Sequence, residues 1–198
     1  HRVGDDVGGS GFASYGFWNG STYDIDLVGN QQGGNGTYSY GFYNNAAATF
    51  TSIVGNQQGG SRDYCYGFFN YAAATFTSIV GNQTGGSRDY CYGFFNNAAA
   101  TFTSIVGNQQ GGSGYYSYGF FNIGAATFTS IVGNQTGGSG NQSYGFYTNA
   151  AGSKITFENS FQKTGVYQAV YNAGDSTTIN FKNCRAYANS IYNSKSTT

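Results

Sequence analysis

The sequence is poor in the residues that carry most protein chemistry. Its 198 residues include no proline, no methionine, one histidine and three cysteines, and 8% of them are charged, against about 25% in an ordinary globular domain. The formal net charge is zero, so no field of one sign attracts nucleic acid or an acidic membrane. No apolar run reaches the roughly 18 residues of a membrane-spanning helix. We therefore expect no nucleic-acid partner, no membrane span, no metal and no cofactor.

What the chain has in excess is glycine and aromatic side chains, and they are arranged in a repeat. It contains 33 Gly, 19 Tyr and 17 Phe. The stretch YGFFNNAAATFTSIVGNQ begins at Tyr92, and its copies follow at a step of 26 residues. The other copies begin at Tyr40, Tyr66, Tyr118 and Tyr144, with a shorter one at Tyr15 and a degenerate one at Tyr167. A fixed period of about 20 to 50 residues is typical of stacked repeats.

The repeat unit favours strands. Each unit carries several Gly and runs of β-branched and aromatic residues, without helical spacing, and it is too short for a propeller blade of about 40 residues. The sequence therefore predicts an all-β fold, a parallel β-solenoid (β-helix) with about six to seven 26-residue coils. Within a coil, YCYGFFN is predicted as one strand, NAAA as a tight corner and TFTSIVG as a second strand. NQTGGSRD is predicted as a polar turn with a short third strand leading into Tyr90.

The solenoid is expected to fill most of the chain. Residues 1–13 are predicted to form an N-terminal extension or cap that contacts another subunit, residues 14–190 the solenoid, and residues 191–198 a C-terminal tail. A solenoid has open strand edges at both ends, which invite pairing with a further chain. We therefore expect copies of the same chain as partners, joined end to end or by strand exchange.

Charges in the later repeats indicate which face of the second strand is buried. In KITFENS, Lys154 and Glu158 should face water, which turns Phe157 inward. Carried through the repeats, this register predicts a core ladder. Its members are Phe50, Phe76, Phe102, Phe128, Phe157 and Phe181. The YDIDL of the first copy argues for the opposite register, which a bulge or its missing residue would reconcile.

The first strand is aromatic on both of its faces. Alternation puts Tyr64, Tyr66 and Phe68 on one side, with Cys65 and Phe69 on the other. If the smaller side is inside, a wide aromatic strip lies on the surface, where it would be an interaction site.

Two cysteines fall at the same position of adjacent repeats. Stacking would place Cys65 and Cys91 about 4.8 Å apart, within the usual Cα range of about 4.4–6.8 Å for a disulfide. A disulfide that bridges two coils and a pair of buried thiols both remain open. Cys184 stands apart.

Acidic residues offer weak candidates for chemistry. Asp63 and Asp89 should stack as a carboxylate pair, as in carbohydrate-active β-helix enzymes, but a surface charge ladder beside the neighbouring Arg residues explains them better. Asp24 and Asp26 share a strand face, and we expect solvated carboxylates there rather than a calcium site. His1 has no second histidine with which to hold copper. No catalytic residue is predicted, and the chain is not expected to be an enzyme.

A Thr-x-Thr pattern recurs at the second strand. Stacked coils would turn it into a flat array of hydroxyl and methyl groups, similar to the ice-binding face of solenoid antifreeze proteins. The array consists of Thr49, Thr51, Thr75, Thr77, Thr101, Thr103, Thr127 and Thr129. The alternative is ordinary β-branched strand chemistry.

Several Asn residues match the acceptor pattern for N-glycosylation. They are Asn19, Asn35, Asn82, Asn134 and Asn141. In a chain so rich in Asn, Ser and Thr the pattern also arises by chance, in which case these residues form turns and internal ladders.

The repeat YGFFNNAAATFTSIVGNQ and the later ITFENSFQKTG resemble the right-handed β-solenoid passengers of bacterial autotransporters and related surface adhesins, over residues 14–190. This resemblance implies an extracellular or cell-surface rod that serves as scaffold, adhesin or filament subunit, with surface glycans as further partners. We therefore expect a structural subunit of an extracellular filament or adhesive surface fibre. The alternatives are an ice-binding protein, a carbohydrate-active enzyme and an amyloid-like aggregate.

Overall fold

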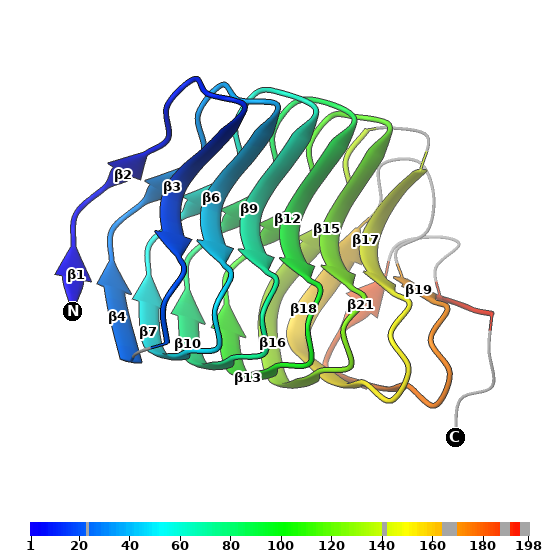
Figure 1. The fold of residues 1–198 in the computed structure, drawn as a ribbon. Coiled ribbons are helices and arrows are strands. Elements are labelled where there is room, and N and C mark those ends of the chain that lie inside the picture. The colour runs from blue at the N-terminus through cyan, green and yellow to red at the C-terminus, as the bar shows by residue number, and fades with distance from the viewer. Residues whose placement is uncertain (23, 140–141, 164–169, 187–190, 195–198) are drawn as a thin grey trace.

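A computed structural model describes the chain except for residues 23, 140–141, 164–169, 187–190 and 195–198. Its described residues form strands and turns and no helix. The strands of successive repeats pair in parallel and wind into a β-solenoid, drawn in Figure 1. The predicted fold class, an all-β parallel solenoid with 26-residue coils, is confirmed. No described helix could span a membrane.

One coil consists of two main strands and a short third strand. In the coil that begins at Tyr64, these are β9 (Tyr64–Asn70), β10 (Thr75–Val80) and β11 (Gln83–Thr84). The predicted corner lies between β9 and β10. The third strand lies at the start of the polar segment, directly after the Gly-Asn corner, and not next to Tyr90 as the sequence suggested.

The first strands of the coils form one sheet of eight strands. They are β3 (Ala13–Asn19), β6 (Tyr38–Asn44), β9, β12 (Tyr90–Asn96), β15 (Tyr116–Asn122), β17 (Gln142–Thr148), β19 (Val170–Asn172) and β22 (Ile191–Asn193). Pairing therefore continues into residues 191–193, which the sequence assigned to a tail.

The second and third strands form the other sheet. Its long strands are β4 (Asp24–Val28), β7 (Thr49–Val54), β10, β13 (Thr101–Val106), β16 (Thr127–Thr136), β18 (Lys154–Lys163) and β20 (Thr178–Lys182). Its short strands are β5 (Gln31–Gln32), β8 (Gln57–Gln58), β11, β14 (Gln109–Gln110) and β21 (Arg185–Ala186). β16 and β18 each continue without a break through the corner that separates the long strand from the short strand in the coils before them.

The corner between the long and short strands requires glycine. Gly81 has a φ of 140°, a conformation that residues with a side chain rarely adopt. A Cβ at this position would also lie 1.8 Å from the carbonyl oxygen of Gly55 in the preceding coil. The repeated Gly-Asn of the sequence is therefore fixed by backbone shape and by the close stacking of coils.

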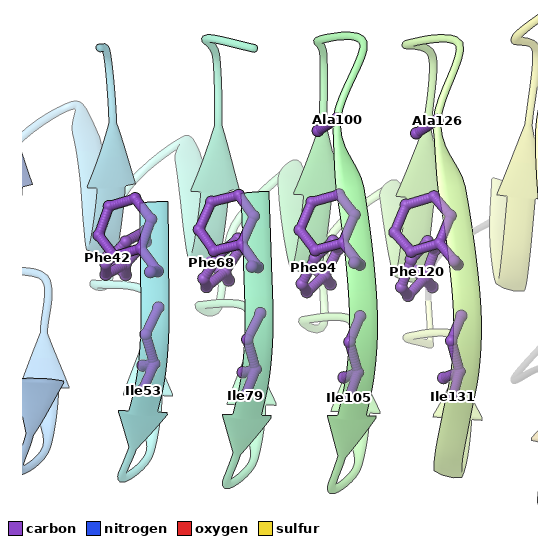
Figure 2. Close-up of a cluster of buried hydrophobic side chains, with 14 of the residues drawn as sticks. Phe42, Ile53, Phe68, Ile79, Phe94, Ala100, Ile105, Phe120, Ala126 and Ile131 are labelled. Atoms are coloured by element: carbon purple, nitrogen blue, oxygen red, sulfur yellow. The ribbon is translucent and has the colours of Figure 1, made fainter. Parts of the chain in front are cut away.

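Phenylalanine rings from both sheets fill the core. Phe68 stacks on Phe94 at 4.6 Å, and Phe76 stacks on Phe102 at 4.7 Å between ring centroids. Across the core the rings meet edge to face, as for Phe94 and Phe102 at 5.4 Å and 72°. Figure 2 shows the column that contains Phe68 and Phe94 running parallel to a column of Ile side chains. Such aromatic pairs contribute about 0.5–1.5 kcal/mol each beyond the burial of their surface.

Amide side chains share the interior with the rings. The buried Asn70 donates its Nδ2 hydrogen bond to Oδ1 of Asn96 over 2.8 Å. The buried Gln83 donates to Oε1 of Gln57 over 2.9 Å and to the carbonyl oxygen of Gly81 over 2.8 Å. Because each amide finds its partner in the copy of itself one coil away, these polar groups are buried without losing their hydrogen bonds.

The long strands contain an extra residue that the alternation of side chains does not predict. Phe76 and Ile79 are both fully buried, although residues three apart in a regular strand point to opposite faces. In β4 the buried residues are Ile25 and Leu27, only two apart. The first copy is therefore one residue shorter because β4 lacks the extra residue that the other long strands contain. The pairing of β4 with β7 shifts register at this point. This shift reconciles the two conflicting predicted registers.

The same register shift corrects the predicted Phe ladder. In β18, Ile155 pairs with Phe128, so the column of Phe50, Phe76, Phe102 and Phe128 ends there. Phe157 pairs with Ile131 and continues the Ile column instead. Phe181 stacks on Phe157 at 5.5 Å but is 36% exposed, so its prediction as a core residue was wrong. One face of its ring is covered, because it belongs to the outermost described long strand.

Residues 1–13 add a further half coil rather than a separate extension. β1 (Arg2–Val3) pairs with β4, and β2 (Asp6–Val7) pairs with β5. Arg2 lies in register with Leu27, and it forms an ion pair with Asp6. At this end of the solenoid, an ion pair therefore occupies columns that are filled by aliphatic and Gln side chains in the next coils.

We expect Phe94→Ala to destabilise the fold strongly, because the ring is fully buried between two stacked neighbours. The loss should be about 3–5 kcal/mol. Phe181→Ala is the matched control, and its effect should be much smaller because the ring is 36% exposed. Denaturant unfolding followed by circular dichroism measures both. Equal losses for the two variants would contradict the difference in burial.

Candidate functional site

The Thr-x-Thr array lies on the outer face of the long strands. Thr75 pairs with Thr49 on one side and with Thr101 on the other, and all three are exposed. The second Thr of each pair, such as Thr77, is also exposed, while Phe76 between them points into the core. The eight predicted Thr residues therefore form a surface array whose rows are about 4.8 Å apart.

The array ends where the outer coils change residue type. Asp24 pairs with Thr49 at one end and Lys154 with Thr127 at the other. A shallow groove lined by the alanine corner runs beside the first Thr column. The neutral Thr array is thus bounded by a carboxylate and by an ammonium group.

The outer face of the first sheet carries a layer of packed aromatic rings. Tyr66, Phe69 and their copies form one cluster outside the sheet, whereas Phe68 belongs to the core. The predicted alternation, which grouped Phe68 with Tyr64 and Tyr66, was therefore wrong beyond Gly67. Gly67 faces inward, because a Cβ there would lie 2.7 Å from the carbonyl oxygen of Gln57.

These outer rings cover one another. Tyr64 stacks on Tyr90 at 4.8 Å and 9°, and Tyr90 stacks on Tyr116 at 4.9 Å and 10°. Because stacked rings occupy each other's faces, this column offers ring edges and hydroxyl groups to the solvent. Burial raises the pKa of Tyr66 and Tyr92 well above the ordinary value of 10.0, with neighbouring Tyr side chains adding to the effect.

Cys65 and Cys91 pair in register, and both are fully buried free thiols. Other coils have Ser in the same column, and both residue types donate a hydrogen bond to the turn that precedes the strand. Cys91 Sγ donates to the carbonyl oxygen of Arg88 over 2.7 Å, as Ser117 Oγ donates to that of Gly114 over 2.6 Å. A hydrogen bond with the Cys91 thiol, together with burial, raises the pKa of Cys65. The disulfide stays a prediction.

Asp63 and Asp89 lie in exposed turns of successive coils, each preceded by an exposed Arg. The backbone N–H groups of Tyr90 and Tyr116 donate to their carbonyl oxygens over 2.8 and 2.7 Å, which stacks one turn above the other. The carboxylates are therefore neighbours on an open surface. This arrangement matches the predicted surface charge ladder.

The remaining ionisable candidates are also on the surface. His1 and Asp24 are exposed, and Asp26 is half-buried. The described residues include no group of three or more His, Cys, Asp or Glu side chains placed to hold a metal ion.

The candidate glycosylation sites differ in accessibility. Asn19 is 1% exposed and donates to Oδ1 of Asn44 over 2.8 Å inside the coil, so a glycan has no room there and this prediction was wrong. Asn82 and Asn134 are exposed, but the Nδ2 atom of each donates to the Asn of the preceding coil. Asn35 is exposed in a turn. Asn141 lies outside the described residues.

The comparisons with known proteins gave no match: no protein-family model, curated protein or solved structure matches this chain.

The outer tyrosines should make the fold sensitive to alkali. Burial raises the pKa of Tyr40, Tyr66, Tyr92 and Tyr118 above the ordinary value of 10.0. A raised pKa favours the folded state below pH 10, and this contribution is lost as the pH rises above the ordinary value, where unfolded tyrosines ionise. We expect phenolate absorbance to appear together with unfolding, and Tyr92→Phe to move the unfolding midpoint to higher pH.

A pH titration monitored by ultraviolet absorbance and circular dichroism checks this expectation. Tyr192→Phe is the control, because Tyr192 is 46% exposed. Full ionisation of all tyrosines near pH 10 in a folded chain would contradict the packing of the outer rings.

Proposed function

We propose that the chain is a structural subunit of an extracellular filament or adhesive surface fibre. The observation that carries the proposal is the unbroken stacking of like residues from coil to coil, both in the core rings and in the amide ladders. Each coil presents the next one with the same backbone and side-chain template. Such a quasi-one-dimensional stack resists local opening and can be extended by adding coils.

The two ends of the described solenoid support head-to-tail contact. Arg2 and Phe181 lie at opposite ends of one column, which contains Leu27 near the first end and Phe157 near the second. Arg2 already lies over the ring of Phe17 at 5.5 Å. In a head-to-tail stack, the guanidinium group of one copy would meet the exposed face of Phe181 in the next, a favourable cation–π arrangement.

Electron microscopy and sedimentation velocity of the purified chain test this function. We expect filaments, and sedimentation that shifts to larger species as concentration rises. Arg2→Ala should reduce assembly because it removes the cation at the proposed junction. Lys154→Ala is the control, because it removes an exposed cation from a strand that is paired on both sides, and it leaves both ends unchanged. A chain that stays monomeric at high concentration would contradict the proposed function.

A second candidate function is ice binding, which the exposed Thr array favours. The array is uncharged and repeats at the strand spacing, so it can order water on hydroxyl and methyl groups that recur from coil to coil. If the array binds ice, Thr77→Leu and Thr103→Leu should abolish thermal hysteresis. Thr84→Leu should leave it unchanged, because Thr84 belongs to β11, outside the array. Absence of hysteresis in the unmodified chain would eliminate this candidate.

A further inference from the structure

The middle of the rod carries one isolated group of charges. Between Leu27 and Ser153 the charged residues are Arg62, Asp63, Arg88 and Asp89. We call these four residues the charge quartet. All four are exposed, and they lie in the turns that precede β9 and β12.

The quartet has the form of two parallel columns of opposite sign. Tyr64 pairs with Tyr90, so the residues just before them stack as Arg62 with Arg88 and as Asp63 with Asp89. In the next coil the same two columns contain the uncharged residues Gly114 and Tyr115. Gly114 lies directly against Arg88, because a Cβ on Gly114 would touch the Arg88 backbone. The backbones that carry like charges are therefore about 4.8 Å apart, and like charges directly opposite each other destabilise neighbouring strands.

Within the part of the chain that the structure describes, no ion pair neutralises a member of the quartet. The ion pairs of Arg2 with Asp6 and of Lys182 with Glu158 lie elsewhere. The flanking residues in the two columns, Gly36 with Thr37 and Gly114 with Tyr115, bring no counter-charge. The charge columns are thus open to a partner.

Symmetry decides which orientation of a second copy fits. When two identical rods face each other about a two-fold axis parallel to the solenoid axis, left and right are exchanged at each level, so every Arg faces an Asp. When the two-fold axis is perpendicular to the rods and lies in the interface, the rods are antiparallel, left and right are kept, and every Arg faces an Arg. The quartet is self-complementary only for parallel rods.

We propose that this edge of the solenoid is a lateral interface at which two copies of the chain pair side by side in the same direction. Arg62 of each copy meets Asp63 of the other, and Arg88 meets Asp89 in the same way. The column of stacked tyrosines that contains Tyr64 borders the quartet and packs against the second copy.

The charges and the rings have separate roles in this interface. Exposed ion pairs contribute about 0.2–1 kcal/mol each, so the quartet mainly selects the partner and its direction. The tyrosine edges provide the apolar contact, and Tyr and Arg are the residue types that dominate protein interfaces. The pairing requires no end-to-end contact, so it stands independently of the proposed filament and would thicken such a filament if both occur.

Charge exchange tests the interface by sedimentation equilibrium. The unmodified chain should form dimers that dissociate as salt is raised. R62D/R88D and D63R/D89R should each lose at least about tenfold in dimer affinity, because every facing pair that is altered becomes a pair of like charges. An equimolar mixture of these two variants should form heterodimers again. A monomeric unmodified chain, or variants that still dimerise alone, would overturn the proposal.

Single substitutions test the direction of pairing. A mixture of R62D with D63R should restore dimers, because parallel rods bring the altered turns of the same coil together. A mixture of R62D with D89R should not restore them, because only antiparallel rods bring those two turns together. Restoration in the second mixture and not in the first would overturn the parallel arrangement. All of these substitutions lie in exposed turns, and circular dichroism verifies that each variant is folded.

Electron microscopy separates this proposal from the proposed function. If R62D/R88D changes paired filaments into single ones, the lateral interface and the head-to-tail contact are both supported. Dimers without any filament support the lateral interface alone. Filaments whose width and dimer affinity are unchanged in R62D/R88D contradict the interface and leave the filament in place.

Discussion

The structure depends on hydrogen bonds between the backbones of neighbouring coils in one fixed register. Gly55 N donates to Val80 O and Gly81 N to Val106 O, each over 2.9 Å, so the same bond recurs one coil further on. A ladder of this kind allows a step of one whole coil and no other. In the regular coils each residue therefore lies over the corresponding residue of the next coil, so that its burial, charge and hydrogen bonding are shared along a column. Burial, ring stacking, amide pairing and like-charge repulsion all follow from this constraint.

The columns also explain how the chain tolerates changes of length. The extra residue in the long strands lies between two buried positions, Phe76 and Ile79 in β10. Where it is missing, as in β4, the strand regains regular alternation and both buried columns continue. A deletion at this point removes an outward side chain and leaves the core intact. A deletion elsewhere in the strand would turn core residues toward the solvent.

The period and composition were sufficient to predict the solenoid, its coil of strands and corners, and its turns of small and polar residues. Alternation alone failed where the backbone departs from a regular strand, at Gly67 and at the extra residue of β10. A glycine inside a strand is a signal of such a departure, whereas no residue type marks the extra residue of β10. The buried Gln column was missed for another reason. Gln83 looks like a turn residue in one coil and becomes an interior residue only when its copies supply the hydrogen bonds. The exposure of Phe181 was missed because it depends on which strand is outermost in the described stack, and a repeat pattern does not specify this.

Two departures from perfect repetition occur in the same coils. One is the change from Ser to Cys in the interior, and the other is the change from Gly to Arg in the exposed turn. Ser39 Oγ donates to the carbonyl oxygen of Gly36 over 2.6 Å. In the two coils that carry Arg at the Gly36 position, Cys replaces Ser, and Cys91 both donates to Arg88 O and accepts from Arg88 N over 3.1 Å. The inner residue and the turn residue thus change together, and in both kinds of coil the inner side chain holds the turn through its backbone. A charged turn in place of a glycine turn is consequently a built feature of two adjacent coils, in which a buried thiol supports the exposed charges.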